Sequence, residues 1–388
     1  MFALATLAAI SSTSFAQSTV TISGTVKAGF SNMQYSNGAT AATNGTAQAL
    51  ADGSSQFHIK GIEDLGGGLK AEFQIDTRFR IDDNGGAGPV PTGAVASQIG
   101  TGNTWLGLTG GFGTIRAGKM DTHYCLGADE HGARATSLAA SSCSLLGYVQ
   151  TATATNGAIA NTSRSTNMFR YISPNMSGLT LQANYSTSWA GTEGGLNVGL
   201  PNVAGNDGKG NAMNLRADYA NGPLTAGLSY WNAKGEDQQA TLARTGQRAN
   251  TIAVGYNFGV AKIGLTYDVS AQRAAAANVA AFTDTKRTAY SIPVVVPMGA
   301  HAVLFTYTSA GDSKTAGTTN ANTGATMVSV GYDHSLSKRT SLGVSYAKVD
   351  NKASAAYNPF VYSALTGNGA VGVGQDTAQL YLGLRHTF

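Results

Sequence analysis

Apolar and polar side chains alternate with a period of two residues along most of this chain, and this alternation restricts its fold more than any other feature. Val20 and Ile22 lie on one face of the first segment, and Thr21 and Ser23 lie on the other. The same split recurs in later segments, for example between positions 69 and 80. No segment shows the 3.6-residue stripe of an amphipathic helix. We therefore predict an all-β chain.

The connections between the alternating segments are short and long in turn. The seven short ones are Glu63–Gly68, Gly110–Gly113, Pro174–Gly178, Asn221–Pro223, Phe258–Val260, Pro297–Gly299 and Ser335–Thr340. The eight long ones are Gln34–Gly53, Ile81–Thr101, Asp121–Ser163, Trp189–Lys209, Gly235–Gln247, Ala274–Asp284, Ala310–Gly324 and Lys352–Val373. Fifteen connections predict sixteen strands, with both termini on the short-turn side.

The chemistry of the two faces decides between a soluble sandwich and a membrane barrel. Charged residues make up only 12% of the chain, about half of the ~25% usual in soluble domains. Beyond the N-terminal segment no run of 18 apolar residues exists, so a bundle of membrane helices is excluded. A sheet can span lipid only when it closes and leaves no unpaired edge. We predict a 16-stranded antiparallel transmembrane β-barrel, with short turns on one rim and long loops on the other.

The first sixteen residues are typical of a secretory signal. An apolar stretch from Phe2 to Ile10 precedes Ser14-Phe15-Ala16, which fits the small-x-small cleavage rule. The basic n-region is missing, so we expect the natural start to lie upstream. Residues 17–388 are then a single barrel domain. Export would place Cys125 and Cys143 in an oxidising compartment, where they are able to pair.

Other function classes find little support in the sequence. The net charge of +4 comes without a cluster of Lys and Arg between aromatics, so we expect no nucleic-acid partner. No G-x-S-x-G elbow is present, and the six histidines form no recognisable triad. Gly66–Lys70 lacks phosphate-loop spacing. We expect no enzyme activity and no cofactor.

Several stretches, in this order and at these spacings, carry a family resemblance. They are Gly61–Phe73, Leu106–Lys119, Phe169–Tyr185, Tyr256–Lys262, Gly331–Thr340 and Leu380–Phe388. With them the chain resembles the trimeric general porins of Gram-negative outer membranes, closest to their anion-selective branch. The resemblance implies a water-filled channel for passive diffusion of small hydrophilic solutes and ions, with a weak preference for anions. It also implies an outer-membrane location with short periplasmic turns and long extracellular loops.

The resemblance further implies partners. A homotrimer is expected, surrounded by outer-membrane lipid and lipopolysaccharide. The terminal Phe388, with Leu380, Leu382 and Leu384 at alternate positions, is similar to the signal that outer-membrane insertion machinery reads in this family.

In this family the third long loop folds into the barrel and narrows it, and basic residues line the facing wall. The 43-residue segment Asp121–Ser163 corresponds to that loop. Its acids are Asp121, Asp129 and Glu130. Arg164 matches a basic wall residue of the family, and Lys119 stands where the family usually has Arg. Further basic residues on the polar parity of their strands are Arg78, Arg80, Arg116, Arg170, Lys60 and Lys27.

The chain departs from the family pattern at four of these positions. Gln56 replaces the first expected arginine, and His58 replaces a usual glycine and should narrow the lumen. Gly102 and Asn103 replace basic residues expected before the fourth strand. These departures weaken the predicted anion preference. A porin that prefers small organic anions is the alternative, and a barrel adhesin or hydrolase is a third.

The two cysteines lie 18 positions apart inside the third loop. We expect a disulfide that would constrain the loop by roughly 3 kcal/mol. The competing interpretation is a metal site of Cys125, Cys143, His123, His131 and Asp129, but the spacing matches no C-x2-4-C pair. We expect no metal.

Reduction of the cysteines tests the pairing. If a disulfide holds the loop, a reducing agent should increase the current noise of single channels in a planar bilayer. Identical traces before and after reduction would contradict a structural disulfide.

Overall fold

A computed structural model describes residues 18–37, 44–79, 81, 99–122, 134–136, 141–150, 156–158, 164–187, 210–235, 244–276, 279, 281–359 and 371–388. Its strands are β1 (Thr19–Ser36), β2 (Gly45–Asp52), β3 (Ser55–Gly66), β4 (Leu69–Phe79), β5 (Thr104–Gly110), β6 (Gly113–Met120), β7 (Tyr148–Gln150), β8 (Asn156–Ala158), β9 (Ser165–Ile172), β10 (Leu179–Ser186), β11 (Gly210–Asn221), β12 (Leu224–Gly235), β13 (Arg244–Asn257), β14 (Lys262–Ala275), β15 (Thr283–Met298), β16 (His301–Ala310), β17 (Lys314–Thr315), β18 (Thr318–Thr319), β19 (Ala325–Ser335), β20 (Thr340–Asn351) and β21 (Asp376–Thr387). Within these ranges the one helix is α1 (Cys143–Leu146). No helix of the described ranges has the length and apolar character needed to cross a membrane.

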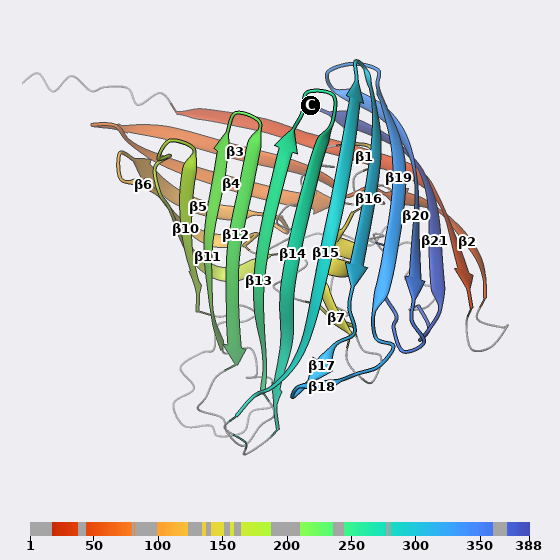
Figure 1. The fold of residues 1–388 in the computed structure, drawn as a ribbon. Helices are drawn as coiled ribbons and strands as arrows, with labels where there is room; N and C mark the ends of the chain where they lie inside the picture. The colour runs from red at the N-terminus through yellow and green to blue at the C-terminus, as the bar shows by residue number, and fades with distance from the viewer. Residues whose placement is uncertain are drawn as a thin grey trace, which may run out of the picture.

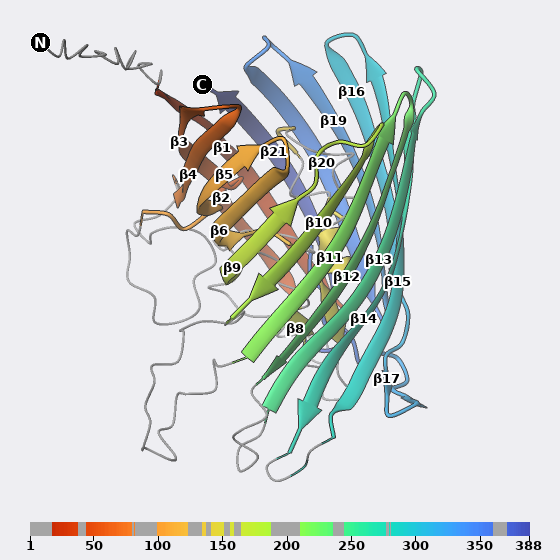
Figure 2. The same ribbon diagram turned by 90° about the vertical axis from the view of Figure 1, so that its left-hand side faces the viewer.

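The described strands form a closed antiparallel barrel (Figures 1 and 2). Neighbouring strands pair in chain order, and β21 pairs back with β1, placing Arg385 opposite Lys27. β3 and β2 pair with successive parts of β1, so together they act as one wall strand interrupted at residues 53–54. Counting them as one, and leaving out β7, β8, β17 and β18, gives sixteen wall strands in the described chain. The prediction of sixteen strands is confirmed.

Short turns and long connections lie at opposite ends of the barrel, as predicted (Figure 1). The C-terminus lies at the short-turn end, beside β1. Some boundaries differ from the sequence prediction: β13 begins at Arg244, inside the predicted connection Gly235–Gln247, and the first long connection differs more. β1 continues to Ser36 and β2 occupies residues 45–52, so strand fills most of the predicted loop Gln34–Gly53. The alternation is weak in β2 and at the end of β1, which is why the pattern did not reveal these residues as strand.

The two faces of the wall differ as the alternation predicts. Val330 is 47% exposed on the outer face, whereas the adjacent Ser329 is 1% exposed on the inner face. The cross-strand neighbours of these residues, Phe305 and Thr306, show the same contrast. Apolar side chains therefore cover the outside, where they can meet lipid tails, and polar side chains fill the inside.

The described part of the third loop lies inside the barrel, where it makes apolar contacts that the wall alone lacks. Leu145 and Leu146 of α1 pack with Ala289, Met327 and Tyr357. Figure 1 shows α1 and β7 between the walls, near β15 and β16. The expectation of an inward-folded third loop is confirmed for these residues.

The chain end seals the barrel next to the N-terminal strand. The backbone amide of Gly24 donates to the carbonyl of Phe388 at 3.0 Å, and the amide of Phe388 donates to the carbonyl of Gly24 at 3.1 Å. A Cβ atom on Gly24 would lie 2.7 Å from the backbone carbonyl oxygen of Gln56 and 2.4 Å from the Phe388 ring, so this position favours glycine. The proposed role of Phe388 in membrane insertion stays a prediction.

A charge placed on the outer face should destabilise the folded barrel in lipid. Val330 lies in the middle of β19, and Val330→Arg should reduce the free energy of unfolding from vesicles by about 2–4 kcal/mol. Urea titration of the protein in vesicles measures this change. Val330→Leu is the uncharged control, and an equal loss in both variants would contradict a lipid-facing position.

Candidate functional site

The inner faces of β1, β3 and β4 bring several of the predicted wall residues together. The strand register places Ser23, His58 and Asp76 side by side on the inner face. Two residues farther along these strands, the next row of lumen-facing residues consists of Thr25, Gln56 and Arg78. The sequence prediction that His58, Gln56 and Arg78 share the lumen face agrees with this register.

Asp76 is the centre of this group. Its carboxylate accepts hydrogen bonds from Nε and Nη2 of Arg78, each at 3.0 Å, and from the amide of Asn103 at 3.0 Å. Nε2 of His58 lies 3.5 Å from the same carboxylate, which is 1% exposed. A Cβ atom on Gly102 would lie 2.0 Å from the carboxyl carbon of Asp76. Gly102 and Asn103, which replace basic residues of the family pattern, therefore make room for this buried carboxylate and bind it.

A second basic group lies across the seam between β1 and β21. Lys27 is buried, and its amide donates to the Ser55 hydroxyl at 3.0 Å. Ser55 in turn donates to Asp52 at 2.5 Å. Arg385 lies directly opposite Lys27 in the register, so two positive charges share this seam. Sequence reasoning missed Arg385, although its position in the alternating last strand was a usable signal.

A third group lies on β6 and β9. Nε of Arg116 donates to Glu72 at 2.9 Å, and its guanidinium stacks 3.9 Å above the centre of the Trp105 ring. Arg170 lies opposite Arg116. It donates to Oδ1 of Asn184 at 2.5 Å and to the backbone carbonyl of Asp121. These two acceptors are neutral, so they do not cancel the charge of Arg170.

Asp121 is the first residue of the third loop, and it contacts residues of the basic wall. Its carboxylate accepts from Nδ2 of Asn103 at 2.6 Å, and its amide donates back to Oδ1 of Asn103 at 2.7 Å. Nε of Arg164 lies 3.6 Å from the same carboxylate. Lys119 lies at a shift of strand register between Gly118 and Met120, where a bulge changes the direction of a side chain. Lys119 interacts electrostatically with Arg164 and Asp76.

The opposite wall holds the loop through a buried arginine. Nη1 of Arg287 donates to Asp268 at 2.9 Å. Its Nη2 donates to the carbonyls of Leu146 at 2.8 Å and Tyr148 at 2.6 Å. The Arg287 side chain is 0% exposed, and it therefore joins β15 to both α1 and β7. No motif marks this residue, and its inward parity in β15 was the available signal.

A second attachment lies on β19 and β20. Thr136 of the third loop donates from its hydroxyl to Asp333 at 2.8 Å. A Cβ atom on Gly343 would lie 2.7 Å from the Thr136 methyl group, so glycine there lets the loop approach the wall. Farther along, the amide of Ala356 donates to Gln150 at 3.2 Å, which adds the last long connection to the same assembly.

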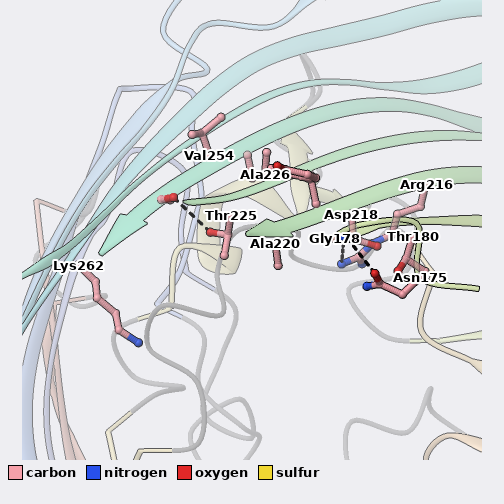
Figure 3. A pocket seen from close by; sticks show the side chains of 14 residues that line it. Asn175, Gly178, Thr180, Arg216, Asp218, Ala220, Thr225, Ala226, Val254 and Lys262 are labelled. Atoms are coloured by element: carbon pink, nitrogen blue, oxygen red, sulfur yellow. Dashed lines mark hydrogen bonds and ion pairs between the residues drawn. The ribbon is translucent and has the colours of Figure 1, made fainter. Parts of the chain in front are cut away.

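A hollow of about 430 Å³ lies at the turn end of β10–β14 (Figure 3). Arg216 and Asp218 form an ion pair there, with Nη2 of Arg216 2.7 Å from the carboxylate. Gln182 donates to the same carboxylate at 3.1 Å. Lys262 and Asn175 line the hollow at its edges (Figure 3). The lining combines these charged and polar side chains with small residues such as Ala226 and Gly227.

The remaining predicted residues divide into two sets. Lys60 lies exposed on the inner parity of β3, and Cys143 is buried at the start of α1. Arg80, Asp129, Glu130, Cys125, His123 and His131 lie outside the described residues, so the cysteine pairing stays a prediction. Among the residues that the structure describes, no group of three or more His, Cys, Asp or Glu side chains is placed to hold a metal ion.

An apolar outer wall around a charged lumen, partly filled by an inward loop, defines an outer-membrane channel. The family model described as "Gram-negative porin" matches residues 3–354, and the chain belongs to this family. It forms a channel of the outer membrane through which small hydrophilic solutes diffuse passively.

Individual relatives agree with this assignment. Outer membrane porin protein 32 of Delftia acidovorans is 28% identical over all of this chain and 99% of that protein. An outer membrane porin protein of Bordetella pertussis is 28% identical over 76% of this chain and 77% of that protein. The solved anion-selective porin from Comamonas acidovorans shares the fold with a TM-score of 0.71 at 24% identity, covering 96% of this chain and 100% of that one.

Replacement of Arg287 should loosen the third loop. Arg287→Met leaves the buried Asp268 without its cation, at a cost of about 3–5 kcal/mol, and removes the donors to Leu146 and Tyr148. We expect noisier single-channel currents in planar bilayers.

Arg273→Met is the matched control, because Arg273 pairs with Asp284 at 3.0 Å and has no bond to the described residues of the third loop. Equally quiet currents from both variants would show that Arg287 does not hold the loop.

Proposed function

We propose that this porin prefers small anions to cations, but only weakly. The observation that carries the proposal is the concentration of basic side chains on one arc of the inner wall. Lys27, Arg78, Arg116, Arg170 and Arg385 belong to β1, β4, β6, β9 and β21, which form one side of the barrel. The loop anchors Asp268 and Arg287 belong to β14 and β15 on the other side. The third anchor, Asp333 of β19, lies two strands from β21 and attracts Arg385.

This arrangement gives a positive path facing the docked loop. A solute passing between the loop and the basic arc meets unequal charge on its two sides. In a narrow passage with low-dielectric walls each charge acts more strongly than it does in bulk water. Anions are therefore favoured in the passage, and weak binding still lets them leave.

The preference is weak because several of these charges are already paired. Arg78 is neutralised by Asp76, and Arg116 by Glu72. Arg164 shares Asp121 at the longer distance of 3.6 Å. Arg170 donates to neutral oxygens, and the nearby Asp121 carboxylate also attracts it.

The assembly and the surroundings of this chain are also proposed from its relatives. Relatives of known structure include OmpT of Vibrio cholerae in a trimer form, with a TM-score of 0.61 at 13% identity. We propose a homotrimer for this chain too, with lipid and lipopolysaccharide around its apolar outer face. We also propose that the terminal Phe388 is read by the outer-membrane insertion machinery, which its place at the accessible chain end permits.

Reversal potential across a salt gradient tests the anion preference. The wild type should favour chloride over potassium in dilute KCl. The preference should fall as salt rises, because the Debye length is ~10 Å at 0.1 M and shorter above it. The double variant Arg164→Gln with Lys119→Gln should shift the reversal potential toward cations.

Lys262→Gln removes the same type of charge at the turn end of β14, away from the basic arc, and serves as control. An unchanged reversal potential in the double variant would exclude both residues from the passage. Block of the current by one class of organic anion would instead favour a substrate-preferring porin.

A further inference from the structure

A pair of histidines lies on the outer face of the barrel, at its periplasmic rim. His301 begins β16 and His334 lies near the end of β19, directly opposite each other in the register. Their Nδ1 atoms are 3.1 Å apart, and their rings stack with centroids 4.5 Å apart. The hydroxyl of Tyr332 lies 2.5 Å from Nδ1 of His301. None of these side chains belongs to the conduction path.

The hydrogen bonds within this trio cannot all form at the same time. A ring nitrogen of imidazole has one in-plane direction for donating or accepting. Nδ1 of His301 nevertheless has two partners, Tyr332 and Nδ1 of His334. Neutral imidazole is also the commonest protein ligand of transition metals.

We propose that His301 and His334 bind a divalent transition metal ion of the copper, nickel and zinc class. Two nitrogens 3.1 Å apart, each about 2.0–2.1 Å from an ion, subtend about 100° at that ion. This angle lies between those of square-planar and tetrahedral sites. The stacked rings must turn about χ2 to aim both lone pairs at one point, and this torsion of histidine is broad.

Water completes the site. Tyr332 is exposed and His334 is half-buried, so solvent reaches the space beside the two rings. Among the described residues no third His, Cys, Asp or Glu joins the pair. Copper should bind most tightly, since affinity rises along the first-row series to Cu²⁺. The bound ion would join β16 to β19 at the end of these strands opposite the long connection that contains β17 and β18.

Copper binding to the full mature chain, purified without an affinity tag and stripped with a chelator, tests the proposal. The probe is Cu²⁺ alone at one equivalent per chain. We expect an electron paramagnetic resonance spectrum with two nitrogen ligands. His301→Asn and His334→Asn should each lose more than about tenfold in affinity, at least the loss seen when outer-sphere partners are removed. Copper should also raise the unfolding temperature of the wild type but not that of either of these two variants.

His386→Asn is the matched control. His386 is also exposed near the turn end, on β21, and bonds to Thr340 at 2.9 Å instead of to a second histidine. It should bind copper as the wild type does. Unchanged affinity in both the His301 and His334 variants, or loss of affinity in the His386 variant alone, would overturn the proposal. Channel conductance measures whether each variant is folded.

Discussion

Backbone hydrogen bonding in lipid is the constraint on which the rest of this structure depends. Each unpaired amide or carbonyl costs several kcal/mol in hydrocarbon, so the sheet has to close. The pairing of β21 with β1 and the two bonds between Gly24 and Phe388 complete that closure. Once the barrel is closed, the direction in which each side chain of a strand points is fixed. Every second residue must face lipid, and the residues between must face water or the loop.

Closure also creates a wide interior that has to be filled. A barrel of sixteen strands is too wide for wall side chains alone to fill. Here part of the interior is filled by the third loop, through small apolar clusters around α1 and β7. The cluster near β7 includes the fully buried Trp231, whose indole donates to Gln247 at 3.2 Å. The loop is therefore held by packing as well as by Arg287 and Asp333, and such a loop can narrow a passage steadily.

The sequence was sufficient for the wall because its signal is repeated in every strand. Strand number, the two kinds of connection and the inward parity of Arg78, Arg116 and Arg170 all follow from one period-two pattern. Pro293 shows the limit of this reasoning, because a proline is unusual inside a sheet. It lies within β15 facing Thr306, and the ladder to β14 is interrupted beside it.

The partners of the charged residues were beyond sequence reasoning, because they join segments far apart in the chain. Nothing local connects Arg287 to Leu146, or Thr136 to Asp333, which are 197 positions apart. Gly102 and Asn103 are a second example of contacts that sequence reasoning did not predict. By comparison with the family pattern they are losses of positive charge, whereas the structure makes them the support of Asp76.

Pairing within the wall links stability to selectivity. A buried charge without a partner is costly, so a lumen that keeps many fixed charges must neutralise some of them. Asp76 neutralises Arg78, and Glu72 neutralises Arg116. The field available to a solute then comes from residues such as Arg170, whose acceptors are an amide oxygen and a backbone carbonyl. Neutral acceptors satisfy the guanidinium without cancelling its charge. Under the proposed anion preference, selectivity would depend on the choice of hydrogen-bond acceptor as much as on the number of basic residues.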